Sequence, residues 1–207
     1  MLPYLSGRVR TNSPTGAFAR SSFRGAARKS LAEGPGGLPG PWNAMLFSTK
    51  IGSLMERMGD ECRNTDTYKA HPNVIEIGIC MVGVDWVSQF EVYAHYKMAR
   101  DAGVSEAMIA ALEAKLPAAQ ASTIDPATPA EVATYAFGRE FLDTKRVSDA
   151  TYARLDAEIG RQGIVELVHT MGHYHNVCMT LNAFNVPLPE GVPLPFEEPA
   201  DASSSSD

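Results

Sequence analysis

The chain has 207 residues, of which 44% are hydrophobic and 20% are charged, and its formal net charge at pH 7 is −6. This length suits one domain with a buried core, and an acidic chain is not expected to bind nucleic acid. No apolar run approaches the roughly 20 residues of a membrane span, because charged residues interrupt the longest one at Glu76, Asp85, Glu91 and Lys97, so we expect a soluble protein without a membrane partner.

The first segment, residues 1–32, carries six basic residues and no acid before Glu33. This composition is typical of an organellar transit peptide. Apolar residues at helical spacing, among them Phe18 and Phe23, instead predict a packed first helix over about 16–32. Both interpretations stay open, and the compartment that we expect is the cytoplasm unless this segment directs the chain to an organelle.

Hydrophobic periodicity predicts further helices along the chain. They are expected over residues 42–63 with a weak break near Ser48, and then over 72–84, 86–102, 106–115, 129–146, 148–159 and 162–185. The segments between them, 34–41, 65–71 and 117–129, are rich in glycine, proline or polar residues and are expected to be connections.

Start and stop signals agree with these boundaries. Pro72 suits the first turn of a helix, and Ser105, Thr128 and Ser148 suit N-caps. Gly103 suits the C-terminal end of the helix before it.

The fold class expected is all-α, with seven or eight helices, because no segment alternates apolar and polar residues between turns as a strand does. Residues 1–189 are expected to form one helical domain with an N-terminal arm. Prolines recur from position 187 onward and end the last helix, so 190–207 is expected to be a disordered tail rich in Pro and Ser.

The three cysteines, Cys62, Cys80 and Cys178, are odd in number and widely spaced. This pattern fits neither a disulfide framework nor a zinc site. Each is expected to pack as a small hydrophobe, and a reducing compartment is the simplest inference.

Polar side chains gather on one face of the predicted helix 86–102. At about 100° per residue, Ser88, Glu91 and His95 fall within an arc of roughly 60°. Glu91 lies one turn before His95, close enough to orient and charge-stabilise the imidazole. Glu76 lies in the preceding apolar helix, where a charge needs a partner or a task. We expect these groups to point into one apolar pocket.

Structural explanations compete for each of these residues. Glu91 can pair along its own helix with Lys97 or Arg100, Glu76 can pair with Arg139, and Ser88 can be a small packing residue.

Glu166, His169 and His173 recur at helical spacing in the last helix and raise the possibility of a metal cluster. The interpretation we favour places His173 or His175 opposite His95 in the pocket, with no metal. No phosphate loop, dinucleotide fingerprint or nucleophile elbow occurs, so no cofactor is expected.

The order of segments and several local phrases resemble the carboxymuconolactone decarboxylase and alkylhydroperoxidase-D-like family. The phrases are GPWNAMLFSTKIG at 40–52, NVIEIGIC at 73–80, QFEVYAHYKMARDAGVSEAMIAAL at 89–112, RVSDATYARL at 146–155 and IVELVHTMGHYHNVCMTLNAFNVPLP at 164–189. The resemblance implies an all-helical domain that assembles into trimers or hexamers.

In the peroxidase branch of that family, a relay Glu precedes a Cys-x-x-Cys pair, and a His follows the second Cys by four positions. By resemblance, Glu76 matches the relay Glu and His95 matches the His, but Ser88 and Glu91 stand where the cysteines would be. A thiol peroxidase needs a reactive thiolate and a resolving thiol. The match therefore favours the decarboxylase branch.

The leading hypothesis is a lyase-type enzyme in which His95, oriented by Glu91, moves a proton on a small organic acid, lactone or carbonyl compound. Glu76 is expected to be a second proton carrier with a pKa raised by its apolar surroundings. The expected substrate-binding residues are Ser88, Trp86, Phe90, Tyr93 and His173, with Met81 helping to exclude water. A thiol peroxidase of the same family and a non-catalytic ligand-binding oligomer are the alternatives.

Overall fold

The computed structural model describes residues 40–197, and within that range it contains α-helices, one 3-10 helix and no strand. The helices are α2 (Trp42–Leu46), α3 (Thr49–Cys62), α4 (Asp66–Ala70), α5 (Pro72–Asp85), α6 (Gln89–Asp101), α7 (Glu106–Glu113), η1 (Ala118–Thr123), α8 (Pro129–Thr144) and α9 (Asp149–Ala183). The predicted all-α class is confirmed. The helix predicted over 16–32 lies outside the described residues.

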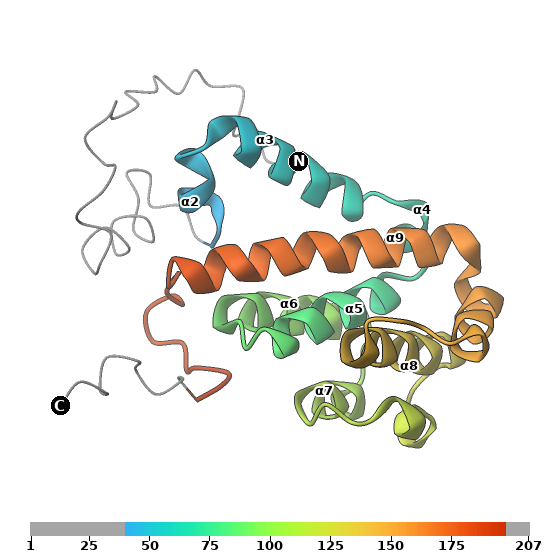
Figure 1. Cartoon of the computed structure of the whole chain (residues 1–207). Coiled ribbons are helices and arrows are strands. Elements are labelled where there is room, and N and C mark those ends of the chain that lie inside the picture. Colours follow the sequence, from blue (N-terminus) through green and yellow to red (C-terminus); the bar gives the residue numbers. More distant parts are fainter. Residues whose placement is uncertain (1–39, 198–207) are drawn as a thin grey trace.

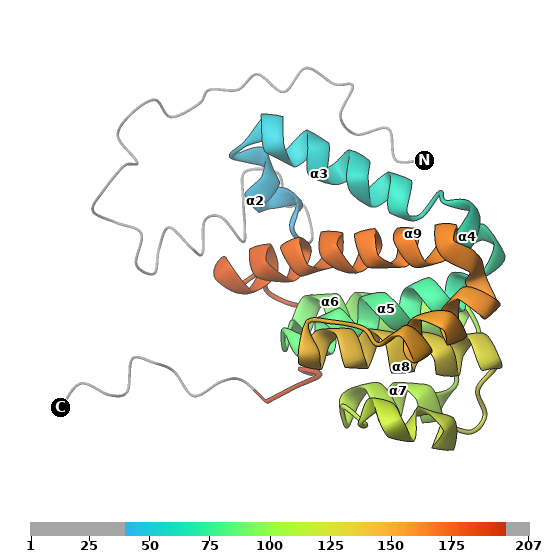
Figure 2. The same cartoon turned by 45° about the vertical axis from the view of Figure 1, so that its right-hand side comes forward.

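The helices stack around α5. Both views place α9 between α3 on one side and α5 with α6 on the other, with α8 and α7 beyond α5 (Figures 1 and 2). All residues of α5 from 74 to 84 are buried, most of them Val, Ile or Met. A helix that is apolar on every side is covered on every side, so α5 is the centre of the core.

Two glycines let neighbouring helices approach α5 closely. A Cβ at Gly78 of α5 would lie 2.6 Å from Cδ1 of Leu167 on α9. A Cβ at Gly138 of α8 would lie 2.7 Å from Sδ of Met81 on α5. Both distances are shorter than van der Waals contact, so a side chain at either position would force Leu167 or Met81 to shift.

The predicted helix starts are confirmed where they rest on side-chain caps. Ser105 accepts a hydrogen bond from the Met108 amide, and Ser148 accepts one from Thr151. Thr128 forms a reciprocal capping box with Glu131. Such caps satisfy amides that have no partner within the helix.

The structure differs from the prediction between Thr65 and His71. This stretch, predicted as a polar connection, contains α4, and the Thr65 hydroxyl caps it by accepting from the Tyr68 amide at 3.0 Å. The two helices predicted on either side of Gly160 are confirmed: they adjoin within α9, and the backbone is non-helical at Gly160, where φ is 70° and ψ is 169°. A positive φ suits glycine, so Gly160 forms the kink between them.

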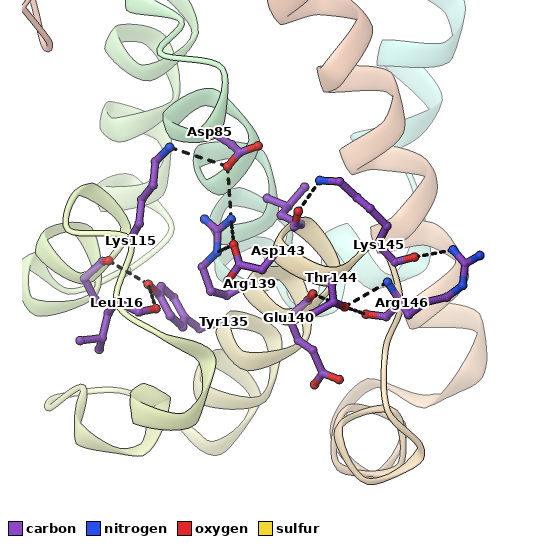
Figure 3. A network of polar contacts seen from close by, with 12 residues as sticks. Asp85, Lys115, Leu116, Tyr135, Arg139, Glu140, Asp143, Thr144, Lys145 and Arg146 are labelled. Atoms are coloured by element: carbon purple, nitrogen blue, oxygen red, sulfur yellow. Dashed lines mark hydrogen bonds and ion pairs between the residues drawn. The ribbon is translucent and has the colours of Figure 1, made fainter.

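Arg139 of α8 and Lys115, which follows α7, both lie against Asp85 of α5 (Figure 3). The Arg139 side chain is buried, and it donates to Asp143 at 2.6 Å and to Asp85 at 3.2 Å, while the Lys115 ammonium lies 3.7 Å from the same Asp85. The possibility that Arg139 pairs with Glu76 is therefore wrong.

The segment after α9 packs further than predicted. The tail was predicted to be disordered from residue 190, yet the Phe196 amide donates to the Gln89 side chain at 3.0 Å and its carbonyl accepts from the same side chain at 2.8 Å. The Phe196 ring also packs against the core. The Phe196 ring and two hydrogen bonds therefore hold this proline-rich segment against α6. Residues 198–207 lie outside the described part.

Between residues 40 and 197, no helix combines the length and the apolar character needed to cross a lipid bilayer.

Candidate functional site

The three titratable residues predicted to meet do meet. His95 of α6 lies between two carboxylates: its Nδ1 is 2.8 Å from Oε2 of Glu76 on α5, and its Nε2 is 3.2 Å from Oε1 of Glu91 one turn earlier on α6. All three side chains are buried. The packing of α5 on α6 creates this arrangement, because Glu76 is far from the other two residues in the sequence.

The two contacts of His95 differ in kind. The contact with Glu76 is a hydrogen bond, whereas the contact with Glu91 lacks hydrogen-bond alignment, and Glu91 Oε1 has no hydrogen-bond partner among the described residues. Glu76 therefore orients the imidazole, and Glu91 lies against the opposite nitrogen as a charge contact. The sequence predicted the reverse division, with Glu91 orienting the ring.

Glu76 is itself held by a second donor. The Tyr68 hydroxyl of α4 donates to Glu76 Oε1 at 3.2 Å, while Oε2 takes the bond from His95. A carboxylate that accepts from both sides fixes the proton of His95 on Nδ1. In that tautomer the lone pair of Nε2 is left facing Glu91.

Burial and the neighbouring charges act in opposite directions on these groups. Burial alone would lower the pKa of His95, but the carboxylates of Glu91 and Glu76 outweigh it and raise that pKa above its ordinary value. Burial raises the pKa of Glu91, and the charge of His95 only partly offsets it. A base with a raised pKa beside an acid with a raised pKa can share one proton.

One residue of α9 covers the imidazole, and a second lies behind it. The Tyr174 ring meets His95 edge to face with centroids 4.8 Å apart, and His173 meets Tyr174 in the same way at 5.2 Å. Burial lowers the pKa of His173 to about 4, so its ring is neutral at pH 7. His173, predicted to line the pocket opposite His95, is therefore separated from His95 by the Tyr174 ring.

The remaining predicted substrate-binding residues lie at varied distances from this centre. Ser88 is fully buried and interacts with the thiol of Cys178. The Trp86 indole donates to His175, and the Phe90 ring lies against Gly40. None of these contacts involves His95.

Tyr93 is 38% exposed and lies edge-on to Phe90, with ring centroids 6.1 Å apart. It is two residues before His95, and positions two apart do not share a helix face. The structure therefore places Tyr93 away from the buried centre.

The competing pairings predicted for Glu91 are not formed. Lys97 pairs with Asp101 at 2.5 Å, and Arg100 pairs with Glu106 at 2.6 Å. The cations that might have neutralised Glu91 along the helix are engaged elsewhere, which leaves His95 as its charged neighbour.

The histidines of α9 do not gather around a metal. The His169 ring bonds the Val165 carbonyl and is exposed, while Glu166 accepts from the Thr67 amide and from Gln162. Across residues 40–197, no group of three or more His, Cys, Asp or Glu side chains is arranged to hold a metal ion.

All three cysteines are free and buried. Burial raises the pKa of Cys62, Cys80 and Cys178, and the carboxylate of Glu91 raises that of the last two further. A thiol in such surroundings stays protonated and is a poor nucleophile.

Sequence reasoning missed three residues at this site: Tyr68, Tyr174 and Arg63. Arg63 follows α3, and its charge acts on Glu91, His95 and His173. The Thr65 cap would have indicated α4, which carries Tyr68, but no local pattern indicates which helix faces which.

No family model matches the chain, and no curated protein or solved structure is detectably similar to it.

The lowered pKa of His173 predicts how stability depends on pH. An unfolded histidine binds a proton below about pH 6.5, whereas folded His173 stays neutral down to about pH 4. The unfolded chain therefore binds more protons in this window, and the free energy of unfolding should fall as pH decreases through it. When the pH is lowered from about 7.5 to 5, the free energy of unfolding should fall by about 1 kcal/mol less in His173→Gln than in the unsubstituted chain, after allowance for solvent screening.

Urea unfolding at the two pH values measures this difference. His169→Gln is the matched control, since His169 is exposed on the same helix, and should behave as the unsubstituted chain does. If the free energy of unfolding depended on pH equally in His173→Gln and in the unsubstituted chain, the lowered pKa of His173 would be contradicted.

Proposed function

We propose that this chain is a carboxymuconolactone-decarboxylase-like enzyme that moves a proton on a small organic acid, lactone or carbonyl compound. The observation that carries the proposal is the chain of contacts Tyr68–Glu76–His95–Glu91, at 3.2, 2.8 and 3.2 Å, in which the last three side chains are buried. Buried carboxylates cost free energy unless they are paired. A fold that keeps two of them around one imidazole has the groups that acid–base catalysis needs.

Each residue takes a distinct role in this proposal. Glu76 holds the Nδ1 proton of His95 and stabilises the imidazolium when it forms, as an orienting carboxylate does. His95 Nε2 is the group that takes the proton. Glu91, with its raised pKa and with its unpaired Oε1 3.2 Å from that nitrogen, is the carrier that delivers a proton to Nε2 or receives one from it.

The chemistry balances without a redox partner. In decarboxylation of a β-keto acid, the bond between the α-carbon and the carboxylate breaks, its electron pair becomes the enolate, and CO2 leaves. The enolate carbon then takes a proton from the His95 imidazolium or from Glu91. In isomerisation of a lactone, His95 Nε2 removes a proton from one carbon and the same pair returns it to another.

The alternatives are less well supported. A thiol peroxidase needs an accessible thiolate, and the cysteines here are buried with raised pKa values. Three reduced thiols also suit the reducing cytoplasm expected from the sequence. A purely non-catalytic role leaves the buried charges around His95 without a task.

Replacement of His95 should abolish turnover. His95→Gln keeps a polar side chain between Glu76 and Glu91 but removes the group that accepts the proton, so activity should fall by at least about a hundredfold. The assay is a panel of β-keto acids and unsaturated γ-lactones. It is read by CO2 release and by exchange of carbon-bound protons with D2O.

His169→Gln, on the exposed side of α9, is the control and should retain activity. Circular dichroism should show equal helix content in both variants. Full activity in a folded His95→Gln variant would end the proposal.

We further propose that the chain works as a homo-oligomer, a trimer or hexamer as the resemblance implies. Three exposed apolar side chains form a stripe at helical spacing on α3, namely Ile51, Leu54 and Met58, which are 62%, 62% and 36% exposed, and Phe47, just after α2, is 51% exposed. A contiguous apolar stripe of this kind is typical of an interface.

Charges on this stripe should break the assembly. Ile51→Asp combined with Leu54→Asp should reduce the mass measured by light scattering from a multiple of 22.3 kDa toward that of one chain. Lys50→Asp adds a charge change beside the stripe on an already polar, exposed residue and should leave the mass unchanged. A multiple of the chain mass that survives the double substitution would exclude this stripe as the interface.

A further inference from the structure

Arg63 does not pair with the acidic residues near it in the sequence. Asp60 and Asp66 lie three residues on either side, where ion pairs along the chain are common. In the described part of the chain Arg63 forms no ion pair: its Nε donates to the Gly59 carbonyl at 3.4 Å, and Asp66 lies against Lys69 instead. A half-buried guanidinium without a carboxylate partner retains unused donors.

The Arg63 charge acts on buried groups of the site described above. It opposes the raised pKa of Glu91 and His95 on α6 and of Tyr174 on α9, and it adds to the lowered pKa of His173. A distant arginine in water would be screened from buried groups. Arg63 therefore contributes to the electrostatics of both helices at the centre.

His173 supplies a second polar group on the same side of α3. A Cβ at Gly59 would lie 3.0 Å from His173 Nε2 and 3.9 Å from Arg63 Nη2. The two nitrogens are therefore no more than about 7 Å apart. A carboxylate that accepts one bond of about 2.8 Å from each can bridge such a separation.

The protonation of His173 agrees with a donor role. The side chain is only 9% exposed, and its Nδ1 has no hydrogen-bond partner among the described residues. A buried N–H without a partner costs more than an unpaired acceptor, so the neutral ring places its proton on Nε2. Nε2 is the nitrogen beside Gly59 and Arg63.

We propose that Arg63 and His173 together bind the carboxylate of a small organic acid and position the rest of that molecule toward His95. Tyr174 lies between the two halves of the site, with ring contacts to both His173 and His95. This inference rests on the proposed function for its catalytic meaning, and it narrows the substrate class to acids that carry a carboxylate apart from the reacting carbon. Arg63 is a positioning residue here.

Benzoate binding to the full-length chain tests the inference without turnover. Benzoate should bind in the millimolar range, measured by calorimetry, and benzamide, its neutral counterpart, should bind at least about tenfold more weakly. Arg63→Gln should weaken benzoate binding by about tenfold or more. Arg63→Lys keeps the charge but loses the fork, and should give an intermediate loss.

Arg57→Gln is the matched control, because Arg57 is an exposed arginine on α3, the helix that Arg63 follows, and it should bind benzoate as the unsubstituted chain does. Three results would overturn the inference. The folded Arg63→Gln and Arg63→Lys variants could bind benzoate as tightly as the unsubstituted chain does, the unsubstituted chain could bind benzamide as tightly as benzoate, or it could bind no benzoate at all.

His95→Gln separates this inference from the proposed function. That variant should still bind benzoate with its Arg63 dependence intact. Turnover that persists in it would remove the acid–base proposal and leave the carboxylate site standing. If benzoate affinity did not depend on Arg63 while His95→Gln still lost turnover, the carboxylate site would be wrong and the acid–base proposal would stand.

Discussion

The hydrogen bond between His95 Nδ1 and Glu76 is the constraint on which the rest of the site depends. Both groups are buried, and a buried carboxylate without a partner would cost several kcal/mol. Because Tyr68 holds the other oxygen of Glu76, the ring has one orientation and one place for its first proton. The second nitrogen is thereby free to exchange a proton with Glu91.

The fold supplies this geometry through close packing around α5. Gly78 brings α9 close enough to α5 for Tyr174 to cover the imidazole. Gly83 lets α6 approach in a similar way, since a Cβ there would lie 3.0 Å from Cγ2 of Val92, the residue after Glu91. Arg139 joins α8 to α5 through Asp85, while Asp143 of its own helix accepts from the same guanidinium. Interiors packed this tightly keep catalytic groups at fixed distances.

Local patterns predicted the helices well because caps and periodicity are local properties. Ser105 and Thr128 mark helix starts through bonds to amides three residues away. Glu91 and His95 could be paired in advance because one helical turn separates them. Glu76 could only be singled out as a charge in an apolar run, and its partner depends on how α5 packs on α6. The orienting role therefore went to the wrong carboxylate in the prediction, and Tyr68, Tyr174 and Arg63 were missed.

The position of the His95 proton tests the central claim most directly. Nuclear magnetic resonance of ¹⁵N-labelled histidine distinguishes the two ring nitrogens, which differ in chemical shift when protonated. The account predicts that Nδ1 stays protonated between about pH 5 and 8 and that Nε2 is the nitrogen that titrates, with a pKa above the ordinary value. A neutral ring with its proton on Nε2 and none on Nδ1 would contradict it.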